Sequence, residues 1–131
     1  PERNVLYKKY FPSAKKTKVI DWDFVETCWE KEPREYQYVA ANYLKAMQSY
    51  LTESDLPKLE RLVVTKSWWD TVDILDRVVG SLVYDKPELE KIILQWSLSD
   101  NIWLRRVAID HQLLRKEKIK FLECTLRILK I

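Results

Sequence analysis

Hydrophobic residues recur at helical spacing along most of the chain, and prolines or helix-starting polar residues separate the runs. This pattern predicts a helix over 22–31 that Asp21 caps, and Pro33 then starts a second helix over 34–51. Further helices are expected over 55–65, 68–84, 87–97 and 101–115, with a short helix over 1–11 and a last one beginning near 117.

Polar residues mark two of these helix starts. Ser67 and Asp70 match a capping box ahead of the helix over 68–84. Asn101 or Asp100 is expected to cap the helix over 101–115.

The predicted helices repeat in pairs. First helices begin near 22, 55, 87 and 117, and second helices begin near 34, 68 and 101. The period is about 30–35 residues, which is typical of α-solenoid repeats. The sequence therefore predicts an all-α repeat that forms a single domain over 1–131, with the second helix of each pair on the concave wall.

Composition supports a helical protein and says less about its partners. The chain has 131 residues, of which 47% are hydrophobic, and its one glycine and five prolines are too few for a protein built of hairpins. A net charge of +3 is compatible with a polyanionic partner but identifies none. There is no apolar run long enough to cross a membrane and no signal peptide.

Cysteine usage and the chain ends give two more expectations. Cys28 and Cys124 lack metal-ligand spacing, so we expect two reduced thiols in a cytoplasmic protein. The chain begins at Pro1 without Met and ends at Ile131 inside an apolar helical pattern, so we expect both ends to be cut or processed.

The most unusual run is a pair of tryptophans followed by carboxylates. Trp69 and Asp73 are four residues apart, so a helix places them on one face, one turn from each other. An aromatic ring beside a carboxylate suits a cationic ligand, through cation–π and Coulomb attraction. Trp68 is expected in the apolar stripe of the core, whereas Trp69 is expected to be exposed in the groove.

The helix over 101–115 carries the matching polar face. Trp103, Arg106 and Asp110 lie on it at helical spacing, whereas His111 belongs to the packed face. Arg106 can present its guanidinium fork to a phosphate, or it can form a structural salt bridge to Asp73 or Asp70. A small rotation of this helix would put Arg105 in the groove instead.

Other candidates have simpler structural interpretations. Gly80, inside the helix over 68–84, indicates either close packing of a neighbouring helix or close approach of a ligand. Arg34 could touch a ligand, or it could belong to an ion-paired helix start. The sequence has no phosphate-binding glycine loop, His/Cys metal cluster or nucleophile elbow, so we expect no metal or cofactor.

These motifs give the chain a family resemblance. It resembles the AlkD-like DNA alkylation repair glycosylases along most of its length. The resemblance is carried by Ser67-Trp-Trp-Asp-Thr-Val-Asp73, Trp96 with Ser97, Asn101-Ile-Trp-Leu-Arg-Arg-Val-Ala-Ile109, Trp22, Arg34-Glu-Tyr-Gln-Tyr38 and Tyr43-Leu44.

The resemblance implies a fold, a function and a set of site residues. The fold would be a HEAT-like α-solenoid, a right-handed superhelix of antiparallel helix pairs, that binds duplex DNA in a basic concave groove. We also expect the chain to be a monomer. The activity would be hydrolysis of the N-glycosidic bond of cationic alkylated purines such as 3-methyladenine and 7-methylguanine, without a tight base pocket. Carried over, Asp73 and Trp69 would be catalytic, and the DNA contacts would be Arg106, Arg105, Trp103 and Arg34.

The chain also departs from this family. Family members are normally longer at both ends, and a C-terminal groove tryptophan in a lysine- and glycine-containing stretch has no counterpart here. The chain is therefore either a fragment or a shortened relative. Two other functions remain open, a non-catalytic nucleic-acid binder and a protein-binding α-solenoid. Asp73 favours catalysis on a cation, because a groove carboxylate repels a phosphate backbone.

Overall fold

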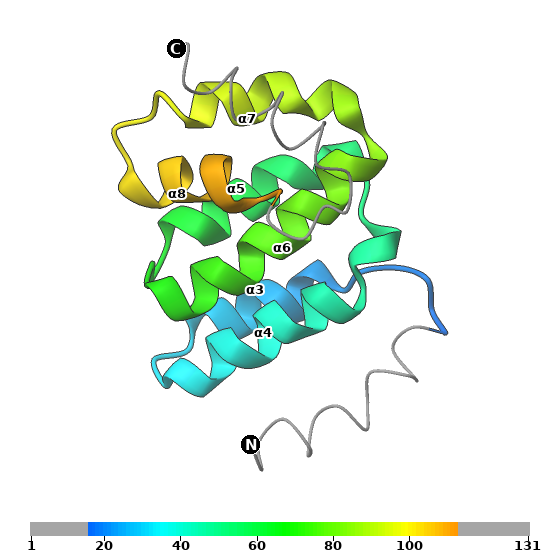
Figure 1. Cartoon of the computed structure of the whole chain (residues 1–131). Helices are drawn as coiled ribbons and strands as arrows, with labels where there is room; N and C mark the ends of the chain where they lie inside the picture. Colours follow the sequence, from blue (N-terminus) through cyan, green and yellow to red (C-terminus); the bar gives the residue numbers. More distant parts are fainter. Residues whose placement is uncertain (1–15, 113–131) are drawn as a thin grey trace. The chain divides into compact units, whose positions relative to one another are not determined.

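The computed structural model describes residues 16–112, which form α-helices and short 3-10 helices without any strand (Figure 1). The predicted all-α helical repeat is confirmed, whereas the helices expected over 1–11 and from 117 lie outside the described residues. The α-helices are α3 (Trp22–Glu30), α4 (Arg34–Ala46), α5 (Leu56–Val64), α6 (Trp69–Asp85), α7 (Glu90–Trp96) and α8 (Ile102–Asp110).

Three of the predicted helices are continued or preceded by a 3-10 turn. The helix expected over 34–51 is shorter than predicted: α4 ends at Ala46, and η1 (Gln48–Tyr50) follows it. Likewise η2 (Glu53–Asp55) precedes α5, and η3 (Pro87–Leu89) precedes α7. Within residues 16–112, no helix is both long and apolar enough to span a bilayer.

The chain divides into two compact units, Pro1–Leu51 and Thr52–Ile131. In the first unit α3 packs against α4, and the ring of Phe24 meets the ring of Tyr43 edge-on at 5.1 Å between centroids. The Tyr43 hydroxyl accepts a hydrogen bond of 2.9 Å from the Asp21 backbone N–H. The Asp21 carboxylate in turn accepts from the Phe24 N–H at 3.0 Å, which confirms it as the cap of α3.

A buried amide closes the turn between α3 and α4. Gln37 is 1% exposed, and its amide donates to the backbone carbonyls of Cys28 and Lys31, each at 2.9 Å. The Cys28 carbonyl lies in the last turn of α3 and also accepts from the Lys31 N–H at 3.3 Å, and the Lys31 carbonyl belongs to the residue after the helix. Cys28 is a buried free thiol, and burial raises its pKa although Lys31 opposes the shift.

In the second unit α6 and α8 pack against each other, and α5 packs against both of them. α7 packs against α8. The expected apolar stripe of α6 is buried from Thr71 onwards, at Leu75, Val78, Val79 and Leu82. This packing fixes the faces of α6 and α8 that remain open to solvent.

The two predicted starts in this unit have different outcomes. Asn101 caps α8, with its side-chain oxygen accepting from the Trp103 N–H at 2.9 Å, so the alternative cap, Asp100, is not used. The prediction of a capping box at Ser67 is wrong, because the N-cap residue of α6 is Trp68, whose backbone is extended. The Ser67 hydroxyl instead donates to the Val63 carbonyl, near the end of α5.

Gly80 marks a close approach between α6 and the backbone at the end of α8. A Cβ atom at this position would collide with the His111 carbonyl oxygen and lie 3.0 Å from the carbonyl carbon. The close-packing interpretation of this glycine is therefore confirmed, because a backbone atom cannot move aside as a flexible side chain can.

We expect Gly80→Ala to lower the free energy of unfolding by about 1–3 kcal/mol in urea denaturation. The direction is informative, because alanine inside a helix normally gains about 1 kcal/mol over glycine. Ser81→Ala is the matched control on the next residue of α6 and should change stability by less than about 0.5 kcal/mol. A more stable Gly80→Ala protein would contradict the packing argument.

Candidate functional site

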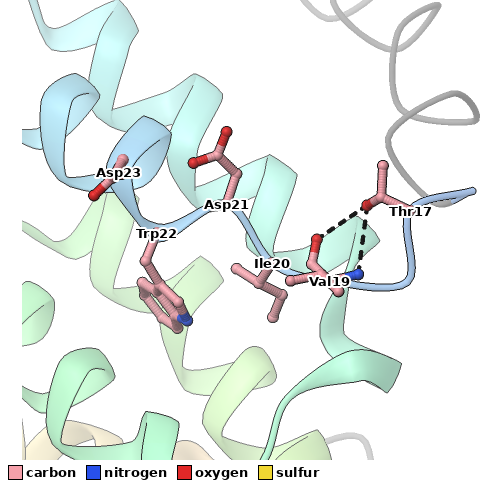
Figure 2. Close-up of a pocket in the computed structure, with 6 residues that line it drawn as sticks. All are labelled: Thr17, Val19, Ile20, Asp21, Trp22 and Asp23. Atoms are coloured by element: carbon pink, nitrogen blue, oxygen red, sulfur yellow. Dashed lines mark hydrogen bonds between the residues drawn. The ribbon is translucent and has the colours of Figure 1, made fainter.

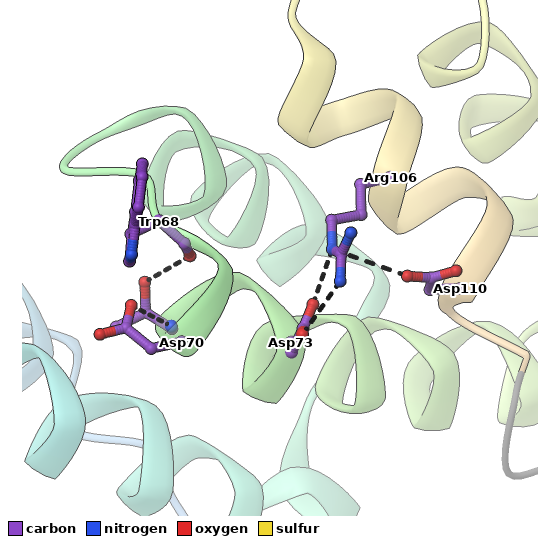
Figure 3. Close-up of polar contacts among 6 residues, drawn as sticks. Trp68, Asp70, Asp73, Arg106 and Asp110 are labelled. Atoms are coloured by element: carbon purple, nitrogen blue, oxygen red, sulfur yellow. Dashed lines mark hydrogen bonds and ion pairs between the residues drawn. The ribbon is translucent and has the colours of Figure 1, made fainter.

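A bidentate ion pair links α6 to α8 on their solvent-facing side (Figure 3). Arg106 Nε lies 2.8 Å from Asp73 Oδ1, and its terminal NH2 nitrogen lies 3.1 Å from Asp73 Oδ2. The side chains are 43% and 37% exposed, so the pair is accessible to a ligand. The salt-bridge alternative for Arg106 is thus formed, and its partner is Asp73.

Arg106 also faces a second carboxylate. Its Nε lies 3.7 Å from Asp110 Oδ2, one turn further along α8 (Figure 3). The hydrogen bonds to Asp73 are the main reason that the pKa of Arg106 is raised, so the guanidinium is held charged. Burial raises the pKa of Asp110, although Arg106 opposes this shift.

Asp76 completes a cluster of three carboxyl groups. Carboxylate oxygens of Asp73, Asp76 and Asp110 all lie within 4.8 Å of one another. Asp76 is only 4% exposed. Burial and then the charges of Asp73 and Asp110 raise its pKa to about 7, against the opposing effect of Arg77 and Arg106. Carboxylates at this spacing could hold a divalent cation, but here the Arg106 guanidinium supplies a positive charge beside them.

The sequence places Asp110 on the polar face with Arg106 but gives it no role, and it does not single out Asp76. The i,i+4 spacing of Arg106 and Asp110 was a usable signal for their contact. The burial of Asp76 depends on how α8 covers α6, which spacing along one helix does not reveal.

Of the two adjacent tryptophans, one is as exposed as the sequence predicted and the other is more exposed. Trp69 is 56% exposed, as expected, and stands one turn before Asp73 on α6. Trp68, expected in the core, is 55% exposed. It precedes the helix in extended backbone, so the helical periodicity that assigned it to the apolar stripe does not apply. Its ring instead lies 6.0 Å from that of Trp103 on α8, with a tilt of 52°.

Two other predicted DNA contacts, Arg105 and Arg34, make contacts of their own. Arg105 is exposed, and its guanidinium donates to the Ser99 carbonyl at 2.8 Å, which ties it to the start of α8. Arg34 belongs to the first unit, where its guanidinium lies 5.9 Å from the centre of the Tyr38 ring. Within the second unit, the structure thus brings together Asp73 and Arg106, with Trp69 one turn before Asp73 on α6.

An open pocket of about 450 Å³ lies in the first unit, around the start of α3 (Figure 2). The Thr17 hydroxyl in its wall donates to the Val19 carbonyl at 3.1 Å. Asp21, which also lines it, is occupied as the cap of α3. These polar groups serve the local turn, so we place the candidate site at the surface of α6 and α8.

Comparison with known proteins now gives these residues a context. The family described as DNA alkylation repair enzyme matches residues 1–131. This chain belongs to the DNA alkylation repair enzyme family. The resemblance seen in the sequence is therefore confirmed at the level of the family. No protein with a curated description is similar enough to match.

A solved structure supports the same assignment for this DNA alkylation repair family member. It is described as a predicted DNA alkylation repair enzyme from Enterococcus faecalis, and it is 26% identical in sequence with a TM-score of 0.77. The similarity covers 96% of this chain and 62% of that one, so this chain spans less than two thirds of its structural relative.

The raised pKa of Asp76 predicts how stability changes with pH. Between its unfolded pKa near 4 and its folded pKa of about 7, the folded protein binds more protons, so the free energy of unfolding should fall as pH rises. Asp76→Asn removes this loss. We expect it to be more stable than the parent by about 1–3 kcal/mol at about pH 8, with little difference at about pH 4.

Urea denaturation across this range tests the prediction. Asp85→Asn is the control, because Asp85 is an exposed aspartate at the end of the same helix. It should keep the pH dependence of the parent. Equal slopes for Asp76→Asn and the parent would show that folding does not raise the pKa of Asp76.

Proposed function

We propose that this chain carries the catalytic site of a DNA glycosylase, which hydrolyses the N-glycosidic bond of cationic alkylated purines in duplex DNA. The observation that carries the proposal is the exposed Trp69 ring one helical turn from the Asp73 carboxylate, on an open surface. Family membership supports DNA repair as the setting. 3-Methyladenine and 7-methylguanine are the substrates that fit this chemistry.

The charge of the substrate explains why the site needs no strong general acid. An N-alkylated purine is already positively charged, so breaking the bond between C1′ and the ring nitrogen releases a neutral base. The positive charge moves to the sugar as an oxocarbenium-like centre, as in glycoside hydrolysis. Water adds to C1′ and loses one proton, which leaves an abasic sugar.

Asp73 and Trp69 suit the two needs of this reaction. A carboxylate can stabilise the positive charge on the sugar and can orient the attacking water or accept its proton. An indole face can contact the cation or the sugar, and Trp69 is free of the packing that buries Trp29 and Trp96 at 3% and 4% exposure. An open surface also fits a substrate that is a duplex rather than a free nucleoside.

Arg106 gives the site a contact for the DNA backbone. Its guanidinium is 43% exposed and can pair with a phosphate in the bidentate geometry it now uses for Asp73. Arg105 and Trp103 lie on the same helix and are proposed as further contacts. The proposed contact of Arg34 with DNA is supported by the family resemblance alone.

We expect Asp73→Asn to lower the rate of 7-methylguanine release from methylated duplex DNA by about 10²–10³-fold. The change keeps the size of the side chain but removes the charge that stabilises the sugar cation. The measurement is single-turnover release of free base, corrected for release without protein.

DNA binding must be measured on the same variants. Asp73→Asn should bind DNA at least as tightly as the parent, because it removes a negative charge from a surface that faces phosphates. Asp85→Asn is the matched control and should retain the parental excision rate. Salt-dependent binding without excision by the parent protein would support the non-catalytic binder and contradict the glycosylase.

A further inference from the structure

Trp68 is an exposed indole that neither the core nor the proposed catalytic pair accounts for. It is 55% exposed, and its extended backbone lies just before the first residue of α6. A packed indole buries about 150–250 Å², so a tryptophan left mostly in water gives up much of the stabilisation that its side chain can supply. Its neighbour Trp69 is 56% exposed and is already assigned to the reaction. Trp68 is therefore open to a second use.

Trp103 supports one side of the Trp68 ring. The centroids of the two rings lie 6.0 Å apart with a tilt of 52°, within the range in which aromatic pairs attract each other. Trp103 is half-buried in α8, and its backbone N–H donates to the Asn101 cap at 2.9 Å. It is thus a fixed support, and a ring that is already supported loses less side-chain freedom when it binds a ligand.

This aromatic pair lies along the same two helices as the ion pair of the candidate site. Trp68 and Asp73 belong to the start of α6, and their partners Trp103 and Arg106 are three residues apart on α8, so both contacts join α6 to α8 (Figure 3). Five residues of helical rise span about 7 Å. One strand of DNA advances about 3.4 Å per nucleotide. A strand whose phosphate binds Arg106 therefore reaches Trp68 within about two nucleotides.

The charges near the two indoles favour an anionic strand over an apolar partner. Lys66 lies two residues before the first indole, and Arg105 and Arg106 lie on α8 beyond the second; all three are exposed. The acids Asp70 and Asp100 lie at the starts of α6 and α8. The positive ends of the helix dipoles partly offset these two negative charges. A nucleic-acid strand suits both the aromatic surface and the basic side chains.

We propose that Trp68, supported by Trp103, stacks on an unstacked base of the DNA within about two nucleotides of the phosphate bound by Arg106. This inference rests on the proposed function, because it takes damaged DNA as the ligand. Trp68 is a DNA contact rather than a catalytic residue. Trp103, itself a proposed DNA contact, also acts as a positioning residue by holding the Trp68 ring.

The stacking chemistry selects disrupted DNA over intact duplex. In a paired duplex each base face is covered by its neighbours, so an indole finds a free face only where a base has left the stack. Opening the stack costs least at a mismatched or damaged position. An aromatic side chain that stacks on a free base normally contributes about 5–150-fold to affinity, with little dependence on the base. Trp68 therefore gives the protein a preference for the site of damage without reading its sequence.

Filter-binding titrations at one fixed salt concentration test this with two probes, a paired duplex and the same duplex with one unpaired nucleotide. We expect the parent to bind the second probe more tightly. Trp68→Ala should weaken binding to it by about 10–100-fold and change binding to the paired duplex by less than about threefold. Trp68→Phe should keep most of the preference, because it keeps a ring. Tyr84→Ala, which removes a 48% exposed ring near the end of α6, is the control and should bind both probes as the parent does.

The role of Trp103 is tested by a double-mutant cycle. Trp103→Phe should reduce the preference for the unpaired nucleotide, and Trp68→Ala should then cost much less than it does in the parent. Additive losses would show that the two indoles bind DNA independently and would overturn the supporting role. An equal loss on both probes in Trp68→Ala would overturn stacking on an unstacked base.

Two further outcomes separate this inference from the proposed function and from another occupant. A preference that needs Trp68, in a protein that releases no 7-methylguanine, would support the stacking surface and contradict the glycosylase. Excision that needs Asp73, with unchanged binding of both probes by Trp68→Ala, would support the glycosylase and overturn the stacking surface. Self-association in sedimentation that Trp68→Ala abolishes, with DNA binding unchanged, would assign the indole to a second copy of the chain and overturn the proposal.

Discussion

The close approach of α6 and the end of α8 at Gly80 is the constraint on which the site depends. Because Gly80 has no side chain, the His111 carbonyl can lie against the helix backbone. Asp76 is one turn before Gly80 on α6, and Asp110 immediately precedes His111. A larger residue at position 80 would separate the helices where the three carboxyl groups converge. The position of one glycine therefore controls the electrostatics of a surface one to two turns away.

The fold tolerates three neighbouring carboxyl groups because one is paired with an arginine and another is largely protonated. Arg106 neutralises the exposed Asp73, while burial keeps Asp76 largely protonated below its pKa of about 7. The site can thus hold three carboxyl groups within 4.8 Å without three full negative charges. The surface around Asp73 therefore carries acidic groups within what the family resemblance implied to be a basic groove. In the proposed function, the attraction for phosphate at this place comes from Arg106, which Asp73 and Asp110 already hold in position.

The sequence predicted what depends on local periodicity and capping. The helix pairs, the caps at Asp21 and Asn101, and the buried stripe from Thr71 to Leu82 follow from spacing and side-chain chemistry. The exposure of Trp69 and the pairing of Arg106 with Asp73 were also within reach, because each follows from a helical face or an opposite charge. Periodicity failed at Trp68, which lies just outside the helix that was used to assign it.

Other features depend on contacts between segments distant in sequence. The Ser67 hydroxyl donates a hydrogen bond to the Val63 carbonyl near the end of α5 instead of capping α6. The burial of Asp76 and the need for glycine at position 80 follow from the placement of α8. The spacing of residues along α6 alone predicts neither the burial of Asp76 nor the need for glycine at position 80.

The aromatic contact between Trp68 and Trp103 gives the site a property of its own. The two indoles are 6.0 Å apart, one at the start of α6 and the other in α8. At this separation they exchange excitation energy, and the 55% exposure of Trp68 leaves it open to quenchers in solution. The start of α6 thus carries an exposed indole whose emission is sensitive to molecules that contact it.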